Sequence, residues 1–310
     1  MLQNQSATGL WEPAHGGPEM RDRNFFNALM LKPAIVAHRG HWVNAPENSL
    51  ASIDAAVSAG FEVAEIDIQR SDDGVFFLMH DEMLTRMTGS EFPCHQMSIA
   101  QLQAMPLRQG CGGSGSGFSH HVIPTLAEAL KLAKRRIFLN LDVKHEEDLA
   151  FVAKLVAQMD MQGEASIKVT VQTEVDAQYL LALEEEHGLM VMPKTRFDAE
   201  NCSAMIEQLR AVEATLVEAR FDSLYTLVAH RAEFEQAGLT LWVNTLDRVA
   251  CCGFSDKAAQ KAPDAIWGSL TEAGIGVIQT DAPQVLAAWR QSHMPAFTYQ
   301  AKADKPHLPV

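Results

Sequence analysis

The sequence predicts an α/β protein: a (β/α)8 TIM barrel with an extra β-hairpin arm after its second strand. Short apolar runs, typical of buried strands, alternate with amphipathic helical patterns along the chain. Nine such runs occur, but the second and third are separated by only six residues, too few for the helix that links parallel neighbours. One run is therefore extra, and eight remain to form a barrel, which typically needs about 250 residues.

The candidate strands are spaced evenly enough for a repeating strand–helix pattern. The second and third runs flank the segment QRSDDG, in which Asp73 followed by Gly74 is a hairpin signal. The extra arm therefore folds back on the second strand. The nine runs are residues 34–38, 63–68, 75–79, 137–143, 166–171, 189–193, 215–219, 239–244 and 274–280.

Helical patterns fill most of the gaps between these runs. Leu50, Ile53 and Val57 recur at helical spacing after the first run. Thr125 with Glu128 forms a capping box, which predicts that a helix begins there. These patterns support parallel strands joined by helices.

The chain is long enough for one barrel with short additions at each end. We expect an N-terminal extension over residues 1–31, the barrel over residues 32–291 and a polar tail over residues 292–310. The extension could cap the bottom of the barrel or form a subunit contact. The sequence leaves open whether the chain forms a homo-oligomer.

Composition limits the partners of this protein. The chain has 310 residues, of which 47% are apolar, and a formal net charge of −14. Such a charge disfavours nucleic acid and anionic membranes as main partners, so an anionic substrate needs a local positive site. No apolar stretch is long enough for stable membrane insertion. Five cysteines without a CxxC spacing favour a reducing, cytoplasmic location.

A Gly/Ser-rich segment, RQGCGGSGSGFSHH, covers residues 108–121. It lacks the Lys-Ser/Thr ending of a phosphate-binding P-loop. We therefore expect a mobile loop at the mouth of the barrel rather than a phosphate cradle.

Ionisable side chains gather where the predicted strands end, which is where TIM barrels place their sites. Glu65 and Asp67 are two residues apart, so their carboxylates share one face of a strand. If the hairpin turn centres on Asp72 and Asp73, pairing brings His80 opposite Glu65. The full set is His38 at the end of the first run and Arg39 after it, Glu65 and Asp67 in the second, His80 after the hairpin arm, and Asp142 in the fourth with Lys144 directly after it.

These residue types point to one kind of chemistry. The carboxylates of Glu65, Asp67 and Asp142 are hard oxygen ligands, which suit one divalent cation, Mg²⁺ or Ca²⁺. Arg39 and Lys144 supply positive charge for a phosphate. Two histidines beside a phosphate are suited to general acid and base catalysis near neutral pH. The alternative, that the acidic residues only form salt bridges, would bury many charges without a function. The set therefore predicts phosphodiester cleavage.

The motifs HRG, PEN, EIDIQRSDDG and HD, in this order, closely resemble the glycerophosphodiester phosphodiesterase family. The later segments WVNTLD and GVIQTDAP are similar to that family's final strands. The resemblance implies hydrolysis of a small glycerophosphodiester to sn-glycerol 3-phosphate and an alcohol, as part of lipid and glycerol metabolism. It implies these roles: His38 and His80 as the catalytic pair, Glu65 and Asp67 as metal ligands, Arg39 and Lys144 as phosphate contacts, Glu47 near metal and substrate, and Trp242 as an aromatic wall for the glycerol or head group.

One position departs from the family pattern. The family usually has Glu-x-Lys where this chain has Asp142, Val143 and Lys144. The shorter carboxylate requires the metal to shift or to gain a water ligand. Lipases of the sphingomyelinase D type look similar around these residues. Alternatives are therefore a lysophospholipase D-like or other phosphodiester hydrolase, and a non-catalytic barrel that binds phosphate esters. The head group, the choice of metal and the division of acid and base between the histidines stay open.

Overall fold

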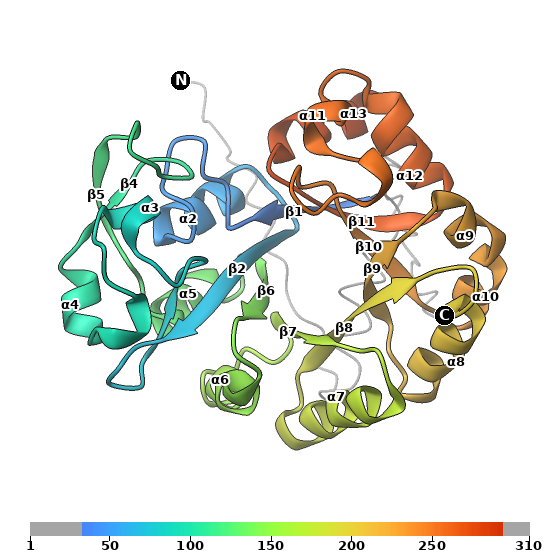
Figure 1. Cartoon of the computed structure of the whole chain (residues 1–310), viewed down its shortest axis with the longest axis horizontal. Helices are drawn as coiled ribbons and strands as arrows, with labels where there is room; N and C mark the ends of the chain where they lie inside the picture. The colour runs from blue at the N-terminus through green and yellow to red at the C-terminus, as the bar shows by residue number, and fades with distance from the viewer. Residues whose placement is uncertain (1–32, 294–310) are drawn as a thin grey trace, which may run out of the picture.

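The computed structural model describes residues 33–293 and contains a closed barrel of parallel strands with helices around it (Figure 1). Each barrel strand pairs in parallel with the next, and β1 pairs with both β2 and β11, which closes the ring. This confirms the predicted (β/α)8 fold. The proposed extension over residues 1–31 lies outside the described residues, as does most of the proposed tail over residues 292–310.

All nine predicted strands are present, with ends that differ by a few residues from the expected ones. The ring runs in the order β1, β2, β6, β7, β8, β9, β10, β11. The strands are β1 (Ala34–His38), β2 (Val63–Arg70), β3 (Phe76–Leu78), β4 (Pro106–Arg108), β5 (Phe118–Val122), β6 (Phe138–Val143), β7 (Ala165–Thr170), β8 (Met190–Phe197), β9 (Leu216–Phe221), β10 (Thr240–Asn244) and β11 (Ile275–Thr280).

Helices cover the outside of the ring. The predicted capping box is present, because the Thr125 hydroxyl accepts a hydrogen bond from the backbone N–H of Glu128. Within residues 33–293, no helix has the length and apolar character needed to cross a membrane. The α-helices are α2 (Leu50–Ser58), α3 (Thr85–Thr88), α4 (Ile99–Gln103), α5 (Leu126–Ala133), α6 (Leu149–Gln158), α7 (Glu174–His187), α8 (Cys202–Ala211), α9 (Leu224–Ala229), α10 (Arg231–Gln236), α11 (Asp256–Ala259), α12 (Ser269–Glu272) and α13 (Pro283–His293), with short helical turns at η1 (Cys94–Gln96), η2 (Glu146–Asp148), η3 (Cys251–Gly253) and η4 (Asp264–Gly268).

The inside of the barrel changes from apolar to polar along the strands. One buried layer is apolar and consists of Ala34, Val36, Val63, Phe138, Met192, Leu216, Trp242 and Val277. Residues two positions further along a strand point to the same side. That next layer is polar, and it includes His38, Glu65, Asn140, Glu218, Asn244 and Gln279. The apolar layer therefore closes the barrel beneath a polar layer at the carboxyl ends of the strands.

The predicted hairpin arm is present, with a register one residue different from the expected one. β3 runs antiparallel to the end of β2, and Leu78 lies opposite Ile68. If this register is continued beyond the paired residues, Glu65 lies opposite Asp81 rather than His80. The expected pairing of His80 with Glu65 is therefore wrong. The cause is the turn, in which Ser71 N–H donates to the carbonyl of Val75, so that the turn contains one more residue.

The segment between β2 and β6 forms a small lobe on the side of the barrel, with α3, α4, β4 and β5 (Figure 1). It has its own apolar cluster, which includes Phe77, Leu84 and Leu107. The Gly/Ser-rich segment is not only a loop, because its last residues form β5, which pairs with β4. The loop between them reaches the mouth of the barrel, where Cys111 lines the cavity. Its mobility stays a prediction.

Candidate active site

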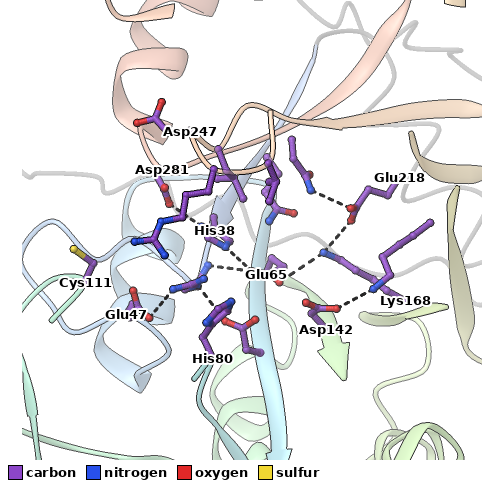
Figure 2. A pocket seen from close by; sticks show the side chains of 18 of the residues that line it. His38, Glu47, Glu65, His80, Cys111, Asp142, Lys168, Glu218, Asp247 and Asp281 are labelled. Atoms are coloured by element: carbon purple, nitrogen blue, oxygen red, sulfur yellow. Dashed lines mark hydrogen bonds and ion pairs between the residues drawn. The ribbon is translucent and has the colours of Figure 1, made fainter. Parts of the chain in front are cut away.

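A cavity of about 610 Å³ opens at the carboxyl ends of the barrel strands. The strands and the loops that follow them supply most of its lining (Figure 2). Of the nine site residues predicted from the sequence, eight line this cavity: His38, Arg39, Glu47, Glu65, Asp67, His80, Asp142 and Lys144.

Trp242 is the exception. Its side chain is fully buried in the apolar layer of the barrel, and it does not line the cavity. The interpretation of Trp242 as an aromatic wall is therefore wrong, because its position on β10 points it below the polar layer. Its indole N–H donates to Oδ1 of Asn244 at 2.9 Å. Within residues 33–293, the tryptophan that lines the cavity is Trp42, whose indole N–H donates to the carbonyl of His38 at 3.1 Å.

Three carboxylates come together at one side of the cavity. One oxygen each from Glu65, Asp67 and Asp142 lies within 4.8 Å of the others. Asp67 and Asp142 are direct partners in the β2–β6 pairing, which explains their proximity. Three hard oxygen donors at this spacing fit a divalent cation such as Mg²⁺ or Ca²⁺.

Cationic side chains surround this group of carboxylates. The Lys144 ammonium contacts Asp67 and lies 2.8 Å from Oδ2 of Asp142, and the Lys194 ammonium lies 3.3 Å from Oδ1 of Asp142. Burial raises the pKa of Asp67, but the charges of Lys144 and Arg39 outweigh it and lower this pKa to about 2. Neighbouring lysines likewise hold the pKa of Asp142 well below its usual range despite its burial. Both groups are therefore carboxylates at neutral pH.

Lys168, on β7, is buried in the same cavity between two of the carboxylates. Its buried ammonium is 3.1 Å from Oε2 of Glu218 and 3.6 Å from Oε1 of Glu65. Burial lowers the pKa of Lys168, but Glu218 and Glu65 outweigh it and raise this pKa above its ordinary value. Lys168, Lys194 and Glu218 were not among the site residues predicted from the sequence. Each of the three is a charged residue within a predicted strand or directly after it, two positions after a residue that faces the inside of the barrel. That spacing could have predicted that their side chains also face inward.

His38 and His80 each have an aspartate carboxylate within hydrogen-bond distance of ring nitrogen Nδ1. Nδ1 of His38 lies 2.7 Å from Oδ1 of Asp281, and Nδ1 of His80 lies 2.7 Å from Oδ1 of Asp81. A carboxylate at Nδ1 leaves Nε2 as the nitrogen that can exchange a proton with a ligand. Burial lowers the pKa of His38, but the hydrogen bond with Asp281 and the charge of Glu65 outweigh it, so this pKa is raised. Figure 2 shows the two histidines on one side of Glu65.

The Glu47 carboxylate forms ion pairs with two arginines and is not part of the cluster formed by Glu65, Asp67 and Asp142. Its Oε1 lies 2.9 Å from Nη1 of Arg39 and 2.6 Å from Nη2 of Arg86. Nε of Arg39 also lies 3.3 Å from Asp67, and Nε of Arg86 lies 2.5 Å from Asp81. Glu47 is buried, and it therefore fixes the direction of the Arg39 guanidinium. Arg86 was missed because it follows the hairpin arm rather than a barrel strand.

The backbone conformation of the HRG and PEN motifs explains why Gly40 and Asn48 occupy their positions. Gly40 has φ of +78°, and a Cβ there would collide with Ser52. Arg39 and Asn48 also adopt positive φ values of 59° and 50°. The Asn48 amide donates to Oδ2 of Asp67 at 2.7 Å, and its oxygen accepts from the Asp67 backbone N–H at 3.0 Å. This tight turn thus places Arg39 and orients Asp67.

Comparison with known protein families agrees with the geometry of the site. The model of the glycerophosphoryl diester phosphodiesterase family matches residues 38–192, which is 155 of the 310 residues. The chain belongs to the glycerophosphoryl diester phosphodiesterase family. A second family model, described only as a domain of unknown function, matches residues 191–290. The family membership expected from the motifs is thereby confirmed.

Members of this family with known names are similar over part of their length. The glycerophosphodiester phosphodiesterase of Caldanaerobacter subterraneus is 30% identical over 115 residues, which cover 37% of this chain and 46% of that protein. Mouse glycerophosphodiester phosphodiesterase 1 is 33% identical over 129 residues, which cover 40% of this chain and 39% of that protein. The chain thus matches about half or less of these relatives.

Solved structures of the same family share the barrel over nearly their whole length. A glycerophosphoryl diester phosphodiesterase from Parabacteroides distasonis has a TM-score of 0.72 at 18% identity, and 90% of this chain and 95% of that one are covered. A phosphodiesterase from Oleispira antarctica, solved with the product sn-glycerol-3-phosphate, has a TM-score of 0.59 at 22% identity, with 83% and 96% covered. These similarities support the fold.

Proposed function

We propose that this protein hydrolyses glycerophosphodiesters to sn-glycerol 3-phosphate and an alcohol, using one divalent cation, Mg²⁺ or Ca²⁺. The observation that carries the proposal is the pairing of His38 with Asp281 and of His80 with Asp81 at one cavity that also holds the three carboxylates. Family membership and the product bound to the Oleispira antarctica relative support this substrate class.

The mechanism assigns each polar group a task. Glu65, Asp67 and Asp142 would hold the cation, which when bound would supply positive charge to neutralise the phosphoryl group. Arg39 binds a phosphoryl oxygen, and Glu47 keeps its guanidinium in place. Hydrolysis forms a bond from the water oxygen to phosphorus and breaks the bond from phosphorus to the alcohol oxygen. One histidine removes the proton from water, and the other delivers a proton to the leaving oxygen, each through Nε2.

The lysines matter for this assignment because they neutralise the carboxylates in the structure. Lys144 contacts Asp67 and Asp142 together. The resemblance to the family implies that Lys144 contacts the substrate phosphate, and with a cation at these carboxylates its ammonium would be free to do so. The three carboxylates therefore fit a cation, with which Lys144 and Lys194 would compete.

The lining of the cavity favours a small polar diester over a lysophospholipid. Its apolar members include Trp42, Leu246 and Val249, whereas most of the remaining residues are ionisable. The acyl chain of a lysophospholipid would need a wide apolar channel, and a cavity lined mainly by ionisable residues is poorly suited to an acyl chain. The two carboxylate-paired histidines favour catalysis over simple binding of phosphate esters. For its location we propose the cytoplasm, on the basis of the cysteine pattern.

The test is release of glycerol 3-phosphate from glycerophosphocholine and glycerophosphoethanolamine, measured with Mg²⁺, with Ca²⁺ and with EDTA. Release that depends on a cation is the expected result. Full release of glycerol 3-phosphate in excess EDTA would show that the reaction does not need a divalent cation. Hydrolysis of a lysophospholipid, but of neither glycerophosphodiester, would show that the substrate is a lysophospholipid and not a glycerophosphodiester. Hydrolysis of none of these compounds would favour the binding barrel.

A further inference from the structure

The cavity has a second cationic region, away from the carboxylate group. Arg220 at the end of β9 and Arg248 in the turn after β10 both line the cavity and are both exposed. In the ring of eight strands, β9 is four strands from β2 in either direction, and β10 is four strands from β6. The end of β9 that carries Arg220 therefore lies opposite the strand of Glu65 and Asp67, and the turn that carries Arg248 follows the strand opposite that of Asp142.

The other cations that line the cavity have acidic partners. Across residues 33–293, neither Arg220 nor Arg248 has a hydrogen bond or an ion pair with another side chain. The paired cations are Arg39 with Glu47 and Asp67, Arg86 with Glu47 and Asp81, Lys144 with Asp67 and Asp142, Lys168 with Glu65 and Glu218, Lys194 with Asp142, and Lys257 with Asp247.

The acidic residues next to the two arginines are already engaged. Asp247 accepts a hydrogen bond from the backbone N–H of Lys257 at 3.0 Å and pairs with its ammonium at 3.2 Å. Glu218 pairs with Lys168 and accepts a hydrogen bond from the Asn244 amide at 3.0 Å. The positive charge of Arg220 and Arg248 is thus not neutralised by these neighbours.

Both arginines are carried by ordered elements. Arg220 belongs to a strand that pairs on both sides, with β8 and β10. The turn that carries Arg248 begins at Thr245, whose backbone N–H donates to the carbonyl of Gln279 at 2.9 Å. The Thr245 hydroxyl also donates to Asp256 at 2.6 Å. In Figure 2, Asp247 of this turn lies at the upper left beside Asp281, Glu218 of β9 lies at the upper right, and His80 lies below both.

We propose that Arg220 and Arg248 form a subsite for a second phosphate, carried as a monoester on the alcohol that leaves. The inference rests on the proposed function, in which the scissile phosphate lies at Arg39 and the carboxylate group. A cavity of about 610 Å³ has room for more than the glycerophosphate part of the substrate. The leaving part then extends across the barrel, where guanidinium groups bind phosphate oxygens in pairs.

The test compares two substrates that differ only in this group: glycerophosphoglycerol, and the same diester with a phosphate on its terminal hydroxyl. For the wild-type protein we expect kcat/KM to be about tenfold higher for the phosphorylated diester, or more. Arg220→Gln and Arg248→Gln should each reduce this ratio about fivefold or more. The matched control is Arg196→Gln, since Arg196 lies beside Arg220 on β8 but pairs with Asp222 and does not line the cavity.

Two outcomes overturn the subsite: equal kcat/KM for the two diesters in the wild-type protein, or an equal loss for both diesters in the arginine variants. Titration calorimetry with the His38→Ala variant measures the affinity of both diesters without turnover. If the wild-type protein hydrolyses neither compound, the proposed function fails. The subsite is then judged on affinity alone, and it is rejected if both diesters bind equally.

Discussion

Nδ1 of His38, at the end of β1, lies 2.7 Å from Oδ1 of Asp281, just after β11. The two residues are 243 positions apart, and the closure of the barrel makes them neighbours. Asp281 is in turn held by its backbone N–H, which donates to Oδ2 of Asp256 at 2.7 Å. His38 is therefore oriented by the last strand of the barrel.

Replacement of Asp281 tests this orientation. Asp281→Asn keeps the size of the side chain but removes the charge that stabilises protonated His38. We expect kcat to fall by about 100-fold, since one general acid or base contributes roughly 10²–10⁴-fold, with little change in KM. Steady-state kinetics measures both constants. Asp160→Asn serves as the control, because Asp160 is exposed and, within residues 33–293, its carboxylate pairs with Lys134 far from the cavity lining. An unchanged kcat in the Asp281 variant would remove Asp281 from the mechanism.

Asp256 gives a prediction for stability against pH. Burial raises the pKa of Asp256 to about 6, although hydrogen bonds from Thr245 and Thr280 oppose this shift. In the unfolded chain the carboxyl ionises near its ordinary value, so between the two values the folded protein binds more protons. The contribution of Asp256 to stability is therefore present at low pH and is lost as the pH rises through about 6.

The matched variant is Asp256→Asn, which cannot titrate and has the same shape. Between pH 4.5 and 7.5 the wild-type protein should lose about 2 kcal/mol of unfolding free energy relative to the variant. Urea denaturation at several pH values measures this difference. If the difference in unfolding free energy between the two proteins is constant over this range, the pKa of Asp256 is not raised in the folded state.

Glu47 should matter for substrate binding and for stability. Glu47→Gln weakens the hydrogen bonds to Arg39 and Arg86, and it leaves two guanidinium groups with one carboxylate partner each. We expect a higher KM and a loss of about 1–3 kcal/mol of unfolding free energy. Glu207→Gln is the control, because Glu207 forms an exposed pair with Arg210 on α8. A lower kcat with unchanged KM would instead place Glu47 in the chemical step.

The sequence predicted what depends on local pattern. Strand ends and i, i+2 spacing were enough to place Glu65 with Asp67 and to predict a barrel. The pairing register of β3 depended on one residue of the turn and was wrong. Trp242 and Trp42 could not be told apart by residue type, because the depth of a side chain along the barrel decides which one reaches the cavity. Partnerships between strands that are not neighbours, such as that of Lys168 on β7 with Glu218 on β9, cannot be predicted from the sequence until the strand order is known.

Lys194 gives a prediction for the proposed cation site. Its ammonium lies 3.3 Å from Oδ1 of Asp142, and it therefore competes with a cation for that carboxylate. Lys194→Met keeps the length of the side chain and removes the charge. We expect the dissociation constant for Mg²⁺ or Ca²⁺ to fall about three- to tenfold, as the loss of one partly exposed charge interaction implies.

Titration calorimetry with the cation alone measures this affinity without turnover. Lys257→Met is the control, because Lys257 pairs with Asp247 after β10, which lies across the barrel from β6. Glu65→Gln should weaken binding, because it removes the charge of one of the three carboxylates. If Lys194→Met leaves the affinity unchanged while Glu65→Gln weakens it, the cation binds without Asp142. The shorter carboxylate at that position would then act only as a partner for lysines.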